Sequence, residues 1–209
     1  MTDFALQGRA RGAERAVLLA HGAGADMNTP TLTAFADALA EHGVPSLRFN
    51  FAYRAAGKGA PPKAPVLEAE VRRSIGELMR RTKLPAERIV LGGRSMGGRI
   101  CSMVAATDGA LGCVLLGYPL HPPGKPERLR IEHFGSLRCP VLFVSGTRDT
   151  FGTPQELQRE AGAISSQVDW YWIETADHGF RPLKKATGLT TQQALIPAAA
   201  AVADWVTGL

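Results

Sequence analysis

The sequence predicts a three-layer α/β/α fold, in which helices cover both faces of a mostly parallel sheet of about six strands. Short apolar runs alternate with segments of helical periodicity, as in parallel sheets with crossover helices. The chain has 209 residues, of which 45% are apolar and 21% charged, so it can bury a core and is not expected to be disordered. We expect residues 1–209 to form a single domain.

The strands are predicted from short runs rich in Val, Leu, Ile and Phe, each bounded by glycine, proline or polar residues. Six segments meet this description, namely residues 16–20, 44–51, 88–92, 111–116, 140–145 and 168–173. No strand is expected before the first of these.

The helices are predicted between these strands. Thr29 suits an N-cap and Pro30 a first helical position, so a helix is expected to begin there and to end before Gly43. Residues 66–81 place apolar side chains every four residues, which predicts an amphipathic helix. Pro197 is expected either to kink the last helix or to delay its start. That last helix is expected at residues 189–206, and two more helices are expected at residues 96–106 and 154–163.

Two connections are long. Residues 52–65 are rich in Ala, Gly, Pro and Lys, and a loop of about 14 residues in a compact domain is usually functional or mobile. Residues 117–138 form a polar, proline-rich stretch of about 22 residues, which is too short for a full cap domain. We therefore expect any active site to be shallow and open.

The strongest motif is Gly93-Arg94-Ser95-Met96-Gly97, a G-x-S-x-G pattern between a predicted strand and a predicted helix. This is the context of a nucleophile elbow, in which a serine stands on a sharp, strained turn. Only small residues fit two positions before and after such a serine, which explains the two glycines. The turn also places Ser95 at the amino end of a helix, where free N–H groups can stabilise an oxyanion.

A serine nucleophile needs a base, and the base needs an orienting carboxylate. Asp149 follows the predicted strand 140–145, and His178 follows the strand 168–173. Both therefore lie in loops at the carboxyl ends of later strands, and the chain order Ser, Asp, His is that of one class of hydrolases. We predict Ser95 as the nucleophile, Asp149 as the acid and His178 as the base.

Other residues could take these roles. Asp177 adjoins His178, but neighbouring side chains usually diverge, so Asp177 is a poor orienting group. The other histidines are more typical of surfaces and turns, and they are His21, His42, His121 and His133.

The loop at His21–Gly24 follows the first predicted strand, where a second oxyanion-hole N–H is expected. We predict that the backbone amides of Ala23 and Met96 form the oxyanion hole. A dinucleotide-binding turn is disfavoured because Met27 stands where its third glycine or alanine would be. A phosphate-binding loop at residues 92–98 is disfavoured because no Lys-Ser or Lys-Thr pair follows.

Four segments, GGRSMGG, HGAG, SGTRDTFG and ADHGF, together resemble the alpha/beta-hydrolase superfamily. More narrowly, they are similar to its small lidless branch, which includes dienelactone-hydrolase-like proteins and testis-expressed-protein-like hydrolase domains. The resemblance covers nearly the whole chain and implies Ser95, Asp149 and His178 as the catalytic residues, on an alpha/beta-hydrolase fold without a cap domain. Two features depart from the pattern. Dienelactone hydrolases use a cysteine where this chain has Ser95, and the two leading antiparallel strands of the full fold are expected to be absent.

We predict a serine hydrolase, of carboxylesterase or thioesterase type, that acts on a small-molecule acyl substrate and needs no cofactor and no metal. Arg94, Tyr118, Phe151 and Phe180 flank the catalytic loops and are expected to contact the substrate, although each aromatic ring could equally belong to the core. The alternative is a hydrolase-like interaction module, since some members of this branch are known as subunits of assemblies.

The net charge of +5 permits an anionic partner. We hypothesise that Arg94, together with Arg54, Lys58 and Lys63, biases the site towards acidic or phosphate-bearing substrates. The alternative is that Arg94 pairs with a buried carboxylate. Nucleic-acid binding is not expected, because the basic residues are scattered along the chain.

Composition also bears on location. The three cysteines, Cys101, Cys113 and Cys139, are widely spaced and form no CxxC pair, which argues against a disulfide framework and a zinc site. The longest apolar run, residues 194–203, is broken by a proline and is too short to span a membrane. Without a signal-peptide pattern, the chain is expected to be cytoplasmic.

Overall fold

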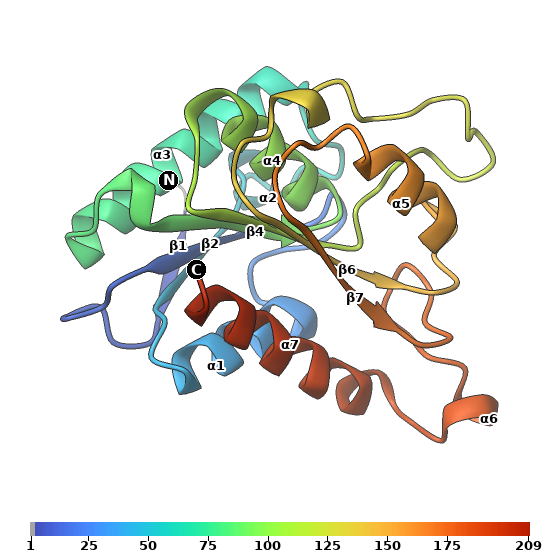
Figure 1. Ribbon diagram of the computed structural model, residues 1–209. Coiled ribbons are helices and arrows are strands. Elements are labelled where there is room, and N and C mark those ends of the chain that lie inside the picture. Colours follow the sequence, from blue (N-terminus) through green and yellow to red (C-terminus); the bar gives the residue numbers. More distant parts are fainter. Residues whose placement is uncertain (1–2) are drawn as a thin grey trace.

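The computed structural model describes residues 3–209 and contains a seven-stranded sheet between two layers of helices (Figure 1). The strands are β1 (Phe4–Gln7), β2 (Ala16–Ala20), β3 (Ser46–Phe49), β4 (Ile89–Arg94), β5 (Gly112–Leu116), β6 (Val141–Gly146) and β7 (Val168–Ile173). Their order across the sheet is β1-β3-β2-β4-β5-β6-β7, and every neighbouring pair except β1 and β3 is parallel. The predicted fold class, a mostly parallel sheet covered by helices on both faces, is confirmed.

The first strand corrects one expectation. β1 lies at the edge of the sheet and pairs antiparallel with β3, so a leading antiparallel strand is present. All its side chains are only half-buried, and Phe4 lies opposite Phe49 on β3. A strand of four residues with no buried run leaves no distinct apolar pattern in the sequence, which is why it was not predicted.

The helices divide between the two faces of the sheet. α1 and α7 cover one face, and α3, α4 and α5 cover the other (Figure 1). Two further helices of four residues, α2 and α6, lie in connecting segments. The bounds are α1 (Pro30–Glu41), α2 (Ala52–Ala55), α3 (Ala64–Thr82), α4 (Met96–Asp108), α5 (Pro154–Ala161), α6 (Lys184–Thr187) and α7 (Thr191–Thr207).

The last helix begins earlier than Pro197 alone would suggest. Thr190 and Gln193 form a capping box, in which each side chain accepts a hydrogen bond from the other residue's backbone N–H. The helix then continues through Pro197, which is exposed. Pro197 therefore lies inside α7 and does not delay its start.

The central strands are buried on both faces. In β2, Val17 and Leu19 face the cluster formed with α1 and α7, whereas Ala16, Leu18 and Ala20 face the cluster on the other side. Burial on both faces explains the continuous apolar runs from which these strands were predicted.

The carboxyl ends of the parallel strands meet at one edge of the sheet, where the site residues lie. The segment 117–138 contains only a short 3-10 helix, Phe134–Ser136, and no cap domain occurs within residues 3–209. Across the same residues, we find no helix with the length and apolar character needed to cross a membrane.

Candidate active site

Ser95 occupies a strained turn between β4 and α4. Its backbone has φ 50° and ψ −117°, a conformation that residues other than glycine rarely adopt. Its N–H donates a hydrogen bond to the carbonyl oxygen of Leu116, at the end of the neighbouring strand β5, at 2.9 Å. The turn is thus anchored to the sheet, and the serine side chain is presented at the carboxyl edge.

The glycines around Ser95 are needed because the turn packs directly against β2. A Cβ atom added to Gly97 would overlap the carbonyl oxygen of Ala20 and lie 2.6 Å from that of His21. A Cβ atom added to Gly93 would also overlap the Ala20 carbonyl and lie 2.9 Å from the Gly97 carbonyl carbon. Both obstacles are backbone atoms, which cannot move without displacing β2.

We expect Gly97→Ala to lower the free energy of unfolding by at least about 2 kcal/mol, because overpacking against backbone forces the chain to shift. Thermal denaturation should show this as a drop of about 5 °C or more. Gly76→Ala is a suitable control, since Gly76 lies in the interior of α3 and an added Cβ would meet no atom within 4 Å. That variant should gain about 0.5–1 kcal/mol from helix propensity, and equal losses in the two variants would contradict the packing argument.

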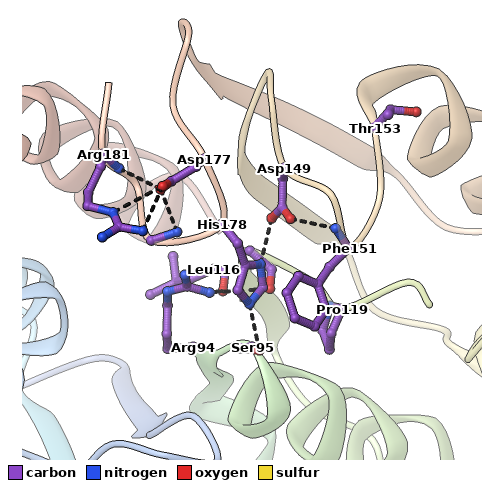
Figure 2. Close-up of polar contacts among 12 residues, drawn as sticks. Arg94, Ser95, Leu116, Pro119, Asp149, Phe151, Thr153, Asp177, His178 and Arg181 are labelled. Carbon is purple, nitrogen blue, oxygen red and sulfur yellow. Dashed lines mark hydrogen bonds and ion pairs between the residues drawn. The ribbon is translucent and has the colours of Figure 1, made fainter. Parts of the chain in front are cut away.

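His178 lies between Ser95 and Asp149 (Figure 2). Its Nε2 is 3.0 Å from Ser95 Oγ, and its Nδ1 is 2.7 Å from Asp149 Oδ2. Asp149 is 1% exposed, and its Oδ1 accepts a hydrogen bond from the Phe151 N–H at 2.8 Å. The Phe151 ring stacks on the imidazole with ring centroids 4.0 Å apart. A carboxylate at Nδ1 keeps the proton on that nitrogen, which leaves Nε2 able to accept the serine proton.

Asp177 points away from this arrangement (Figure 2). Its carboxylate accepts hydrogen bonds from the Gly179 and Arg181 N–H groups at 2.8 and 3.1 Å and forms an ion pair with the Arg181 guanidinium at 2.9 Å. Partial burial alone would raise the pKa of Asp177, but these contacts, chiefly with Arg181, hold the pKa below its usual value. Asp177 therefore organises the loop that carries His178 and does not contact the imidazole.

His21 supports the loop of residues 22–25. It is fully buried, with Nδ1 2.8 Å from the Gly22 carbonyl oxygen, and its Nε2 accepts a hydrogen bond from the Phe51 N–H at 3.1 Å. Because a backbone N–H can only donate, Nε2 must be unprotonated and the proton lies on Nδ1. Burial lowers the pKa of His21, which favours this neutral form.

The remaining histidines lie away from Ser95. His42 is 3.2 Å from a carboxylate oxygen of Asp204, and His121 Nδ1 is 2.9 Å from the Pro122 carbonyl oxygen. His133 Nε2 is 2.8 Å from Ser102 Oγ, and burial lowers the pKa of His133 to about 4. Among the histidines of residues 3–209, His178 alone is brought to Ser95.

The two amides predicted for the oxyanion hole border the same pocket as Ser95. Met96 is the first residue of α4, and the N–H groups of a first helical turn have no acceptor within the helix. The Ala23 N–H makes no hydrogen bond within residues 3–209, and the Ala23 carbonyl oxygen accepts one from the Tyr53 hydroxyl at 2.6 Å. Neither amide is therefore committed to an acceptor within residues 3–209.

The pocket has a volume of about 630 Å³ and collects loops from the carboxyl ends of successive strands. Its lining includes residues 22–25 and the segment around Pro61 and Pro62, which precedes α3. Phe151, His178 and Gly179 also line it. The long connection 52–65 thus contributes to the site, as a loop of its length suggested.

The four residues expected to contact a substrate separate into two pairs. Arg94 and Phe151 line the pocket, whereas Tyr118 and Phe180 do not. Tyr118 is 1% exposed, and its hydroxyl donates a hydrogen bond to the Arg130 carbonyl oxygen at 2.5 Å. Phe180 is fully buried beneath the Arg94 guanidinium, which lies 4.5 Å from the ring centroid. Both rings belong to the core, so neither can touch a molecule in the pocket.

Four basic residues were expected to bias the site towards anionic substrates, and of these only Arg94 lines the pocket. Arg54 Nε donates to the Ala25 carbonyl oxygen at 3.0 Å, and Lys58 and Lys63 are exposed outside the pocket. Arg94 Nη1 donates to the carbonyl oxygens of Leu116 and Gly117 at 3.2 and 3.4 Å. Within the described residues Arg94 forms no ion pair, and the buried Asp149 and the nearby Asp177 act on its guanidinium only through space.

Comparisons with known proteins agree with this architecture. Residues 13–207 match the family model of an alpha/beta hydrolase domain. An alpha-beta serine hydrolase homologue from Coxiella burnetii superimposes with a TM-score of 0.76 and 20% identity, over 97% of this chain and 90% of the other. Dienelactone hydrolase from Anabaena variabilis gives a TM-score of 0.74 and 18% identity, over 99% and 91%. A monoacylglycerol lipase from Paleococcus ferrophilus gives 0.72 and 16%, over 100% and 99%.

Proposed function

Since the chain belongs to the alpha/beta-hydrolase family, as its four motifs predicted, we propose that it is a serine hydrolase that cleaves an ester, thioester or related acyl bond. The observation that carries the proposal is the hydrogen-bonded series Ser95–His178–Asp149 at the wall of an open pocket. Structural neighbours that include a monoacylglycerol lipase and a dienelactone hydrolase share this fold. We further propose a single cytoplasmic domain, in which the three free, buried cysteines stay reduced.

The proposed reaction follows from this geometry. Ser95 Oγ attacks the acyl carbon while His178 Nε2 takes the serine proton, and Asp149 stabilises the imidazolium that results. The negative charge that develops on the carbonyl oxygen is held by the N–H groups of Ala23 and Met96. His178 then gives its proton to the leaving alcohol or thiol. A water molecule, deprotonated by the same histidine, hydrolyses the acyl-serine and restores the enzyme.

A fluorophosphonate probe tests the nucleophile directly. We expect purified protein to be labelled covalently, and peptide mapping by mass spectrometry to place the adduct on Ser95, because phosphonylation requires a serine activated by a base. Heat-denatured protein is the control and should not react. An adduct on another serine, or none at all, would contradict the proposed mechanism.

The alternative, an interaction module without activity, makes a different prediction. It requires neither the 3.0 Å contact between His178 and Ser95 nor the buried carboxylate behind the imidazole. A screen of 4-nitrophenyl esters of increasing acyl length separates the two functions, since a module should hydrolyse none of them above the rate of the denatured control.

A further inference from the structure

The pocket beside Ser95 is lined by three arginines, Arg94, Arg99 and Arg130, and by no aspartate or glutamate. They come from the end of β4, the first turns of α4 and the connection between β5 and β6. Of these three arginines, only Arg94 was expected from the sequence, because Arg99 and Arg130 lie far apart along the chain and neither belongs to a motif. The site is therefore cationic on the side of α4.

Arginines elsewhere in the chain are commonly held by carboxylates. Arg72 contacts Asp108 at 2.7 Å, Arg81 contacts Glu77 at 2.6 Å, and Arg181 contacts Asp177 at 2.9 Å. No ion pair of this kind is made by the three pocket arginines within residues 3–209. No carboxylate of the described residues therefore lies at contact distance from these three guanidiniums.

Arg99 is the least satisfied of the three. Its guanidinium makes no hydrogen bond within the described residues, and its Nε is buried without a partner. A buried donor without an acceptor costs free energy, so such a group in a pocket wall calls for an explanation. Arg94, in contrast, is held by two carbonyl oxygens and stacks on Phe180.

Arg130 lies near Arg99 and shares its lack of a carboxylate. Its Nη1 donates to the Pro119 carbonyl oxygen at a long 3.3 Å, which leaves most of its donors unused. Burial, and next the positive charge of Arg99, lower the pKa of Arg130. Glu132 acts on Arg130 only through space and forms no ion pair with it. Two guanidiniums that line one pocket without a carboxylate at contact distance form a favourable binding site for an anion.

Resting on the serine-hydrolase function proposed above, we propose that the substrate carries an anionic oxygen group, a carboxylate or a phosphate, which Arg99 and Arg130 bind. Arg99 follows Ser95 by four residues on α4, which corresponds to a rise of about 6 Å along the helix axis. The anionic group is therefore separated from the scissile carbonyl by several bonds, in either the acyl or the alcohol part.

Matched esters test the proposal and locate the anion. The acyl pair is mono-4-nitrophenyl adipate and its methyl ester, and the alcohol pair is 4-acetoxybenzoate and its methyl ester. A third anionic compound, 4-acetoxyphenyl phosphate, distinguishes phosphate from carboxylate. We expect the wild-type protein to prefer at least one anionic ester by about tenfold or more in kcat/KM at low ionic strength. Salt should weaken this preference.

Arg99→Gln and Arg130→Gln should each reduce that preference at least about fivefold, mainly by raising KM for the anionic ester. Arg99→Lys keeps the charge but not the planar fork, and should retain an intermediate preference. Arg128→Gln is the matched control. It removes the same charge from the connection that carries Arg130, but Arg128 is exposed and lies outside the pocket. Its guanidinium is 4.0 Å from a Glu127 carboxylate oxygen, so the preference should be unchanged.

The outcomes separate this inference from the proposed function. A protein that is labelled on Ser95 and hydrolyses neutral esters, but prefers no anionic ester, overturns the anion site alone. A preference that survives both glutamine substitutions in folded variants does the same. A protein that is neither labelled nor active overturns the proposed function and this inference with it.

Discussion

Ser95→Ala is expected to lower the turnover of an activated ester by at least about 10⁴-fold, since a hydroxyl nucleophile has no substitute at this position. Alanine tolerates the positive φ of this turn about as well as serine does, and the hydrogen bond from the residue's N–H to Leu116 is kept. The variant should therefore fold normally. Steady-state kinetics with a 4-nitrophenyl ester, alongside circular dichroism, measures both quantities.

Ser102→Ala provides a control for the loss of a serine hydroxyl beside a histidine. Ser102 Oγ is 2.8 Å from His133 Nε2, but Ser102 is buried in α4 and lies outside the pocket. We expect this variant to keep most of its activity. Similar losses of activity in the two variants would contradict the proposed role of Ser95 as the nucleophile.

Asp149→Asn is expected to lower turnover by at least about 10²-fold near neutral pH. The amide can still accept the Phe151 N–H through its oxygen, but it then presents an NH₂ group to His178 Nδ1. The imidazole would have to place its proton on Nε2, where it cannot accept the serine proton. In a well-studied protease the equivalent change costs about 10⁴ in kcat.

Asp177→Asn is the matched control for this prediction. It is the same chemical change on the residue next to His178, but its carboxylate contacts Arg181 and the loop backbone instead of the imidazole. We expect a loss of less than about tenfold. If the two effects were reversed, Asp177 and not Asp149 would be the acid.

The fold and the three proposed catalytic residues could be predicted from the sequence because their signals are local. A strand buried on both faces must be apolar along its length, as β2 is, and an elbow that packs against the Ala20 carbonyl can have only glycine at Gly93 and Gly97. The parallel topology then brings loops after β4, β6 and β7 to one edge. For that reason His178 lies within hydrogen-bonding distance of both Ser95 and Asp149.

Other features depended on packing between segments that are distant in sequence. β1 exists as a strand because it can pair with the edge of β3, not because of any pattern in Phe4–Gln7. Tyr118 and Phe180 could equally have faced a substrate, but neighbouring elements bury both.

The charge of the pocket was decided by tertiary structure alone. Outside pairs three or four residues apart on one helix, such as Glu77 and Arg81, spacing along the chain does not reveal whether an arginine will meet a carboxylate, because that depends on which segments converge around it. Arg72 meets Asp108 on another helix, whereas Arg99 and Arg130 converge on the pocket with no acidic partner at contact distance. The sequence by itself determined the six strands β2 to β7, the elbow and the order of the proposed catalytic groups, since these follow from periodicity and backbone geometry. Only the folded chain decided which charges surround them, because electrostatic partners are set by distances in space.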